Sequence, residues 1–328
     1  MEGMKEPRGV LPEAVLDALP DHIQAILRKI PATLAEGLEE IRIRENRPLM
    51  VSSLGRDYFL SGNGEIASHP SQAYWATRAD SQRILQLISN FSIYAMEEEI
   101  RNGYVTLKGG FRVGLAGKAV LEDGKVKTLK YINSFNIRIS REVIGAARKV
   151  LPYIIKNREV CHTLVISPPQ MGKTTMLRDI ARNLSDGFSG FPGIKTAIVD
   201  ERSEIAGCYK GVPQMRIGLQ TDVLDACPKA VGIMMLIRSM SPRVIITDEL
   251  GRDEDVEAVE EALNAGIKII SSAHGKDIED LFNRPIFSDL MRKKIFERFL
   301  VLGNSLGVGT LEKVYDGQFN ILSKNPVR

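Results

Sequence analysis

The chain has 328 residues, of which 44% are hydrophobic and 26% are charged. These are ordinary globular values, so they exclude a fibrous or wholly disordered protein, and the length favours two domains at roughly 150 residues each. The 44 basic and 41 acidic residues leave a net charge of +3. This balance lacks the strong positive field of a protein that binds nucleic acid mainly through its phosphates.

The sequence carries no signal for insertion into a membrane. No apolar run approaches the ~18–20 residues that cross a bilayer, and the many charges near the start do not fit a secretory signal. The cysteines, Cys161, Cys208 and Cys227, are odd in number and widely spaced, which argues against a disulfide framework or a zinc knuckle. We therefore expect a cytoplasmic protein in a reducing compartment, with no structural zinc.

The first part of the chain changes its hydrophobic period several times. Helical spacing is expected after Pro20, over residues 21–30, and again over residues 81–93. Alternation of apolar and charged residues predicts strands. The expected strands are residues 40–44, residues 49–51 and several short antiparallel ones joined by glycine turns within residues 103–117. Residues 1–149 therefore predict a small α+β domain.

From about residue 155, strands and helices alternate regularly. The expected strands are residues 162–166, 195–199, 243–247, 267–271 and 298–302. The expected helices are residues 173–184, 228–240 and 253–265. Such alternation predicts an α/β domain over residues 150–328, with a mostly parallel sheet and helices on both faces.

The sharpest motif is a phosphate loop between the first of these strands and the first helix. In such a P-loop, backbone N–H groups surround the phosphates of ATP, Lys173 reaches the β- and γ-phosphates and Thr174 ligates Mg²⁺. The residues expected to contact the nucleotide are Ser167, Pro168, Pro169, Gln170, Met171, Gly172, Lys173, Thr174 and Thr175. Ser167 replaces the first glycine of the usual GxxxxGKT pattern, which puts turnover in question more than binding. A chance match at a helix start is the alternative interpretation.

Acidic residues and a histidine follow the next strands. Ligands of open α/β sheets bind outside the carboxyl ends of the strands, where Asp248, Glu249, Glu201 and His274 all lie. We assign Asp248 to Mg²⁺ and Glu249 to activation of the attacking water. His274 is expected to hydrogen-bond the γ-phosphate or to sense its loss. The alternative is a strand end that happens to be acidic and a histidine satisfied within its loop.

The order of P-loop, acidic box at Asp200 and Glu201, Asp248 with Glu249, and His274 resembles the type II and type IV secretion ATPases. This group consists of RecA-like hexameric motors. Four stretches are more similar to one branch, the stage III sporulation AA family of endospore-forming bacteria, and the resemblance covers nearly the whole chain. These stretches are residues 110–117, 134–140, 199–207 and 246–251.

The resemblance implies a RecA-like, Mg²⁺-dependent ATPase that forms a homo-hexamer with nucleotide between subunits. It also implies a mother-cell protein, peripheral to the membrane, that docks on membrane proteins of a channel complex between mother cell and forespore. Glu201 would belong to the catalytic acidic box, and the N-terminal domain would make ring contacts or dock the partner. An arginine from a neighbouring subunit would complete the site. Arg138 and Arg141 are the first candidates, with Arg112, Arg202 and Arg216 behind them.

Two other functions stay open at this point. The first is a RecA-like ATPase acting on single-stranded nucleic acid, because basic residues lie near Tyr104 and Phe111, although a solvated hairpin explains them equally well. These basic residues are Lys108, Arg112, Lys118, Lys125, Lys127 and Lys130. The second is a scaffold that binds nucleotide without turnover, which only Ser167 favours.

Overall fold

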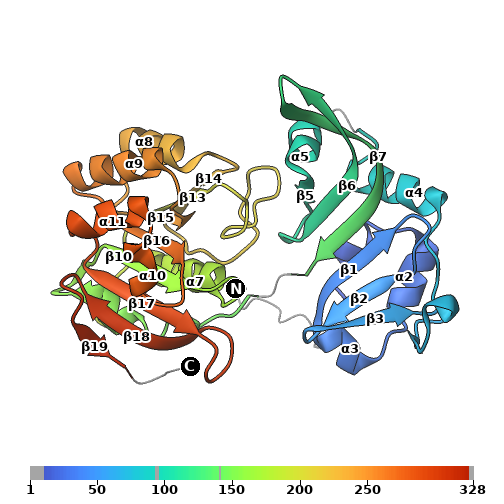
Figure 1. Cartoon of the computed structure of the whole chain (residues 1–328), viewed down its shortest axis with the longest axis horizontal. Helices are drawn as coiled ribbons and strands as arrows, with labels where there is room; N and C mark the ends of the chain where they lie inside the picture. The colour runs from blue at the N-terminus through green and yellow to red at the C-terminus, as the bar shows by residue number, and fades with distance from the viewer. Residues whose placement is uncertain (1–10, 93–95, 140–141, 325–328) are drawn as a thin grey trace. The chain divides into compact units, whose positions relative to one another are not determined.

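The computed structural model describes residues 11–92, 96–139 and 142–324. The chain forms two compact units, Met1–Arg141 and Glu142–Arg328, each with its own sheet and core (Figure 1). The boundary lies a little before the expected break between residues 149 and 150. The reason is that Ala147 is buried in the second core and its backbone N–H donates to Asp179 at 2.8 Å.

The first unit contains a seven-stranded antiparallel sheet in the order β4-β3-β2-β1-β7-β6-β5. Its strands are β1 Leu38–Arg44, β2 Met50–Ser53, β3 Arg56–Leu60, β4 Ile66–Ala67, β5 Tyr104–Thr106, β6 Arg112–Glu122 and β7 Lys125–Arg138. The alternation in residues 40–44 is confirmed, because Ile41 and Ile43 are fully buried while Arg42 and Arg44 lie half-buried on the other face.

Short helices supply the other half of this core. They are α1 Glu13–Leu16, α2 Asp21–Leu27, α3 Ala32–Glu36, α4 Arg78–Ile88 and α5 Glu97–Asn102, whereas the 3₁₀ turn η1 Pro70–Gln72 contributes no buried residue. The helix expected over residues 81–93 begins earlier, because Thr77 and Asp80 form a capping box at its start. It also ends earlier, at Ile88, and Ile93 lies outside the described residues.

The glycine-rich segment differs from the expected row of short strands. Gly109 and Gly110 do form the turn between β5 and β6, with φ of 85° and 77°. Gly117, however, lies inside β6, where a Cβ would approach the carbonyl oxygen of Lys130 to 2.7 Å. The register shifts at that point, between Ala116 and Lys118. This glycine therefore permits close backbone approach at a bulge in a long β6–β7 hairpin.

The second unit is built on an eight-stranded sheet in the order β14-β13-β15-β16-β10-β17-β18-β19. The first six strands are parallel, and β18 and β19 add antiparallel at one edge. The strands of this sheet are β10 Thr163–Ser167, β13 Thr196–Asp200, β14 Thr221–Asp225, β15 Val244–Glu249, β16 Lys268–His274, β17 Arg298–Gly303, β18 Thr310–Asp316 and β19 Ile321–Ser323. The expected mostly parallel sheet is confirmed.

Helices cover both faces of this sheet, as expected (Figure 1). Helix α7 packs on one face, and α8, α9 and α11 pack on the other. The helices are α6 Leu151–Ile154, α7 Lys173–Asp186, α8 Lys229–Ser239, α9 Asp253–Asn264, α10 Glu279–Phe282 and α11 Pro285–Arg292. Two small hairpins complete the unit, β8 Ile155–Lys156 with β9 Glu159–Val160 and β11 Gly187–Phe188 with β12 Phe191–Pro192. Within the described ranges, no helix combines the length and apolar character needed to cross a bilayer.

Candidate active site

The phosphate loop connects the buried strand β10 to α7. Gly172 adopts the left-handed conformation (φ 81°) immediately before Lys173, the first residue of the helix, and Gln170 also has a positive φ of 62°. Ser167 is fully buried at the end of β10, does not have a positive φ, and its hydroxyl donates to the carbonyl oxygen of Pro168 at 2.9 Å. The conformation that only glycine adopts easily therefore falls at Gly172 and not at the serine.

Lys173 joins the phosphate loop to two other strand ends. Its Nζ donates to the carbonyl oxygen of Ser167 at 3.0 Å and lies 2.6 Å from Nδ1 of His274. Nε2 of the same histidine lies 2.9 Å from a carboxylate oxygen of Glu249. Burial lowers the pKa of Lys173 to about 8, and the charge of Glu249 opposes this shift. The structure thus brings together three residues that the sequence placed on separate motifs.

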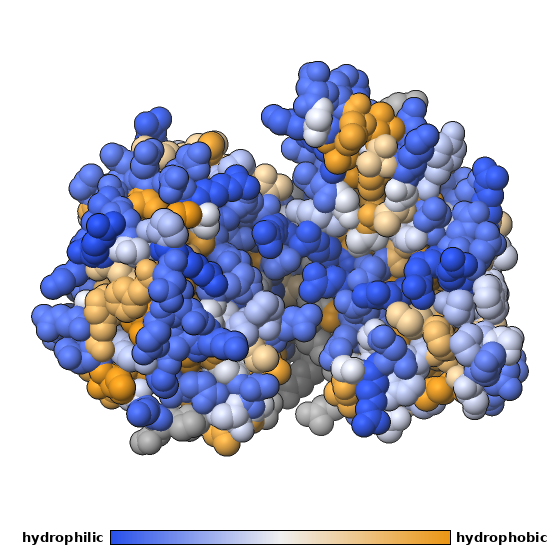
Figure 2. Space-filling view, in the orientation of Figure 1, coloured by the Kyte–Doolittle hydropathy of each residue, from blue (hydrophilic) through white to orange (hydrophobic). Residues whose placement is uncertain are grey.

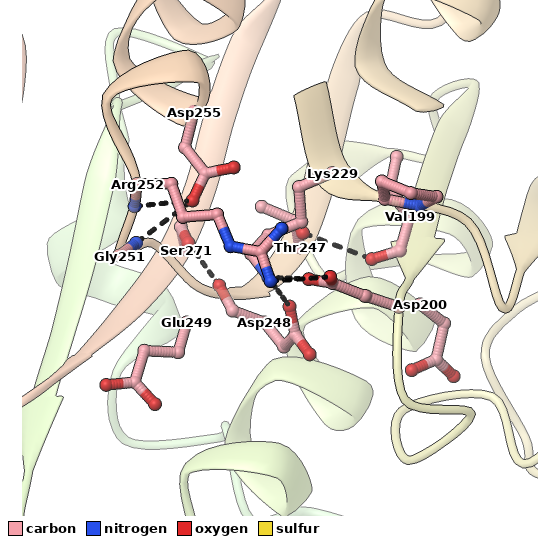
Figure 3. A network of polar contacts seen from close by, with 12 residues as sticks. Val199, Asp200, Lys229, Thr247, Asp248, Glu249, Gly251, Arg252, Asp255 and Ser271 are labelled. Carbon is pink, nitrogen blue, oxygen red and sulfur yellow. Dashed lines mark hydrogen bonds and ion pairs between the residues drawn. The ribbon is translucent and has the colours of Figure 1, made fainter. Parts of the chain in front are cut away.

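A second polar network joins the acidic ends of β13 and β15, which are parallel neighbours (Figure 3). Lys229, at the start of α8, forms ion pairs with Glu201 and, at 3.2 Å, with Asp248. The exposed Arg252 forms a longer ion pair with Glu201, with 3.9 Å between its Nη2 and Oε1 of the carboxylate. Sequence reasoning did not identify Lys229, because a single lysine after a proline at a helix start resembles any solvated residue.

Asp200 and Glu201, the two acids of the acidic box, have different environments and roles. Asp200 is fully buried, and its carboxylate accepts hydrogen bonds from the backbone N–H groups of Glu204 and Ala206, both at 2.8 Å. Burial raises the pKa of Asp200, while these hydrogen bonds oppose the rise. Asp200 therefore fixes the loop after β13, and Glu201 is the acid of this box that reaches the network with Lys229.

The donor set around Asp248 fits Mg²⁺, an ion that prefers oxygen ligands and keeps several waters. Oδ1 of Asp248 is buried without a hydrogen bond, and its only described charge partner at close range is the ion-paired Lys229. Burial raises the pKa of Asp248 to about 6, and Lys229 opposes the rise. Thr174 is half-buried in the first turn of α7. Its hydroxyl and the Asp248 carboxylate are the groups that would hold the ion.

The candidate arginines lie in both units. Arg138 ends β7 and is exposed, whereas Arg141 lies outside the described residues. The Arg112 guanidinium stacks on the Tyr104 ring, 3.4 Å from its centre. Arg216 forms an ion pair with Glu142 at 3.9 Å. The role of Arg138 as a residue that reaches a neighbouring subunit stays a prediction.

Two of the six basic residues considered for nucleic acid, Arg112 and Lys127, are engaged with other side chains. Phe111 is buried in the core of the first unit, and Arg112 covers the ring of Tyr104. Lys127 forms an ion pair with Glu122 at 2.6 Å. Bases stack on open aromatic faces when a protein holds single strands, and these two rings do not offer such faces.

The mostly parallel sheet, the phosphate loop and the polar strand ends define a RecA-like α/β fold. The fold is similar to that of the ATPase DotB from Legionella pneumophila, with a TM-score of 0.54 and 13% identity over 91% of this chain and 78% of that one. It is also similar to the pilus retraction motor PilT with bound ADP, with a TM-score of 0.52 and 14% identity over 89% of this chain and 77% of that one.

The chain belongs to the family "Sporulation stage III, protein AA", whose model matches residues 12–322. It is 48% identical over 310 residues to the stage III sporulation protein AA of Bacillus subtilis (strain 168), which covers 94% of this chain and 97% of that protein. The family resemblance inferred from the sequence motifs is therefore confirmed.

Proposed function

We propose that this protein is a Mg²⁺-dependent ATPase that works as a hexameric, secretion-type motor in sporulation. The observation that carries the proposal is the link from Lys173 through His274 to Glu249, at 2.6 and 2.9 Å. This link connects the group that binds phosphate to the acid that would activate water. Membership of the sporulation family and the likeness to DotB and PilT in fold support the same function.

Each residue of the site has a definite task in this proposal. The backbone N–H groups at the start of α7 and Lys173 would bind the phosphates, and Thr174 and Asp248 would hold Mg²⁺. The ion, when bound, neutralises charge that develops on the phosphate oxygens. Glu249 accepts a proton from the attacking water. When a γ-phosphate attracts Lys173 away from the loop carbonyls, His274 loses its lysine partner, so the histidine is placed to report the nucleotide state.

The N-terminal unit would supply the contacts of the ring or of its membrane partner. Hydrophobic residues gather on the surface over the β6–β7 hairpin (Figure 2). Leu121 and Tyr131 of this hairpin are 63% and 75% exposed. Exposed apolar groups of this size mark many protein interaction sites. Arg138, at the end of the same hairpin, is our candidate for the arginine that completes a neighbour's active site, with Arg141 as the second. Docking on a channel complex of the mother-cell membrane would place the protein at that membrane through protein partners.

The substitution Glu249→Gln tests the proposed reaction. We expect the variant to bind ATP as the unmodified protein does and to lose turnover by ~10²–10⁴-fold, the usual contribution of a general base. The measurements are Mg²⁺-dependent phosphate release and binding of fluorescent ATP, both over a range of protein concentrations. Glu257→Gln, an exposed position on α9, is the matched control and should hydrolyse ATP normally.

The outcomes separate the other functions. Equal hydrolysis by Glu249→Gln would remove the assignment of Glu249. ATP binding without turnover in the unmodified protein at every concentration would favour the nucleotide-binding scaffold. Turnover stimulated by single-stranded DNA, with salt-sensitive binding, would favour the nucleic-acid motor.

A further inference from the structure

Lys229 is a buried cation between two carboxylates that belong to different strands. Its side chain is 9% exposed, and it forms ion pairs with Glu201 after β13 and with Asp248 at the end of β15. Helix α8 begins at this residue, directly after Pro228, so the backbone position of the lysine is well defined. A charge this deeply buried needs compensating charge, and here two acids supply it.

Asp248 is also the carboxylate that we assign to Mg²⁺, so the inference rests on the proposed function. We propose that Lys229 is a positioning residue that takes the place of the metal cation while Mg²⁺ is absent. It neutralises Asp248 and Glu201, and it thereby sets the Mg²⁺ concentration at which the site fills. Two carboxylates on neighbouring strands repel each other without a cation between them. Lys229 supplies that cation from within the chain, and it competes with Mg²⁺ for the Asp248 oxygens.

The surroundings of Glu201 allow this exchange of cations. Arg252 lies 3.9 Å from the other carboxylate oxygen of Glu201, and its side chain is 70% exposed. When Mg²⁺ takes Asp248, Lys229 keeps Glu201 as a partner and Arg252 adds a second cation beside that acid. The network therefore has a balanced arrangement of charge both with and without the metal.

Two variants of the full chain test the inference through Mg²⁺ binding. Binding of fluorescent ADP is titrated with MgCl₂, and the unfolding temperature is measured without nucleotide in EDTA and in MgCl₂. For Lys229→Met, we expect half-saturating MgCl₂ to fall on the order of tenfold, because a competing positive charge is removed. We also expect an unfolding temperature that is lowered in EDTA and recovers in MgCl₂, since the unpaired acids regain a cation. Glu201→Gln should shift the MgCl₂ requirement upward, because Lys229 then pairs with Asp248 alone.

The matched control is Lys268→Met. Lys268 is also ion-paired, with Glu297 at 3.1 Å, but it lies at the start of β16, away from the carboxyl ends of the strands. We expect its MgCl₂ dependence to be unchanged. The inference is wrong if Lys229→Met lowers the unfolding temperature equally in EDTA and MgCl₂, or if Glu201→Gln does not raise the MgCl₂ requirement. The unfolding comparison for Lys229→Met needs no nucleotide, so it tests the inference even if ADP does not bind, and a failure to bind ADP would count against the proposed function alone.

Discussion

His162 is a single residue whose protonation should control stability. It is buried before β10, and its Nδ1 accepts a hydrogen bond from the backbone N–H of Ile269 at 3.2 Å, which requires an unprotonated nitrogen. Burial lowers the pKa of His162 to about 4, and the charge of Lys268 adds to this while Glu297 opposes it. Between about pH 6.5 and pH 4 the unfolded chain binds a proton that the folded chain does not, so stability is full above this window and falls as the pH falls through it.

The expected size of this loss is about 2 kcal/mol between pH 7 and pH 5. It is measured as the difference between the unmodified protein and His162→Gln in the pH dependence of the free energy of unfolding, from urea denaturation. The glutamine variant should lack this part of the slope. Identical slopes for both proteins would show that His162 takes up its proton over the same pH range in the folded and unfolded states.

At the scale of an element, the packing of α8 on β13 depends on a glycine. A Cβ at Gly232 would lie 2.6 Å from a methyl group of Val199, a stiff β-branched side chain. Alanine favours a helix over glycine by about 1 kcal/mol, but overpacking costs about 1–3 kcal/mol. We therefore expect Gly232→Ala to destabilise the protein by about 1 kcal/mol in urea denaturation. Val231→Ala, at an exposed position of the same helix, should be nearly neutral, and a more stable Gly232→Ala would refute the packing argument.

The burial of each strand explains whether it could be predicted from the sequence. Strands β10 and β13 are buried at every position, so continuous apolar runs identified them. Strand β14 was not predicted from the sequence. It lies at the edge of the sheet beside β13, none of its residues is fully buried, and two of them are aspartates, so it shows no apolar run. The outer part of the β6–β7 hairpin is also mostly exposed, so its sequence lacks the alternation of buried and exposed residues that indicates a strand.

The active site shows the same division. Lys173, Glu249 and His274 could be predicted because each lies in a recognisable motif or at the end of an apolar strand. The structure joins them through contacts between Lys173 and His274 and between His274 and Glu249. Lys229 was not predicted. Its partners Glu201 and Asp248 are 28 and 19 residues away along the chain, and they come together beside Lys229 only because β13 and β15 are neighbours in the sheet. Pairing across a sheet is a property of topology, which no local pattern contains.

At the scale of the whole molecule, the proposed ring requires that each active site take residues from two subunits. Glu249 belongs to the unit Glu142–Arg328, whereas Arg138 belongs to the unit Met1–Arg141. If Arg138 acts on the nucleotide of a neighbouring subunit, Arg138→Ala should lower turnover by ~10³–10⁵-fold while ATP still binds. That loss alone does not distinguish an arginine acting within its own chain from one acting on a neighbour.

A mixture of two inactive variants makes this distinction. In a ring assembled from equal amounts of Arg138→Ala and Glu249→Gln subunits, an Arg138→Ala subunit still has Glu249, and a Glu249→Gln neighbour still has Arg138. About one interface in four then joins an intact acid to an intact arginine, so we expect about a quarter of the normal specific activity from two proteins that are each inactive alone. The activity should rise with total concentration as rings form. If Arg138 acts within its own chain, no subunit of the mixture has both groups, and the mixture stays as inactive as its components.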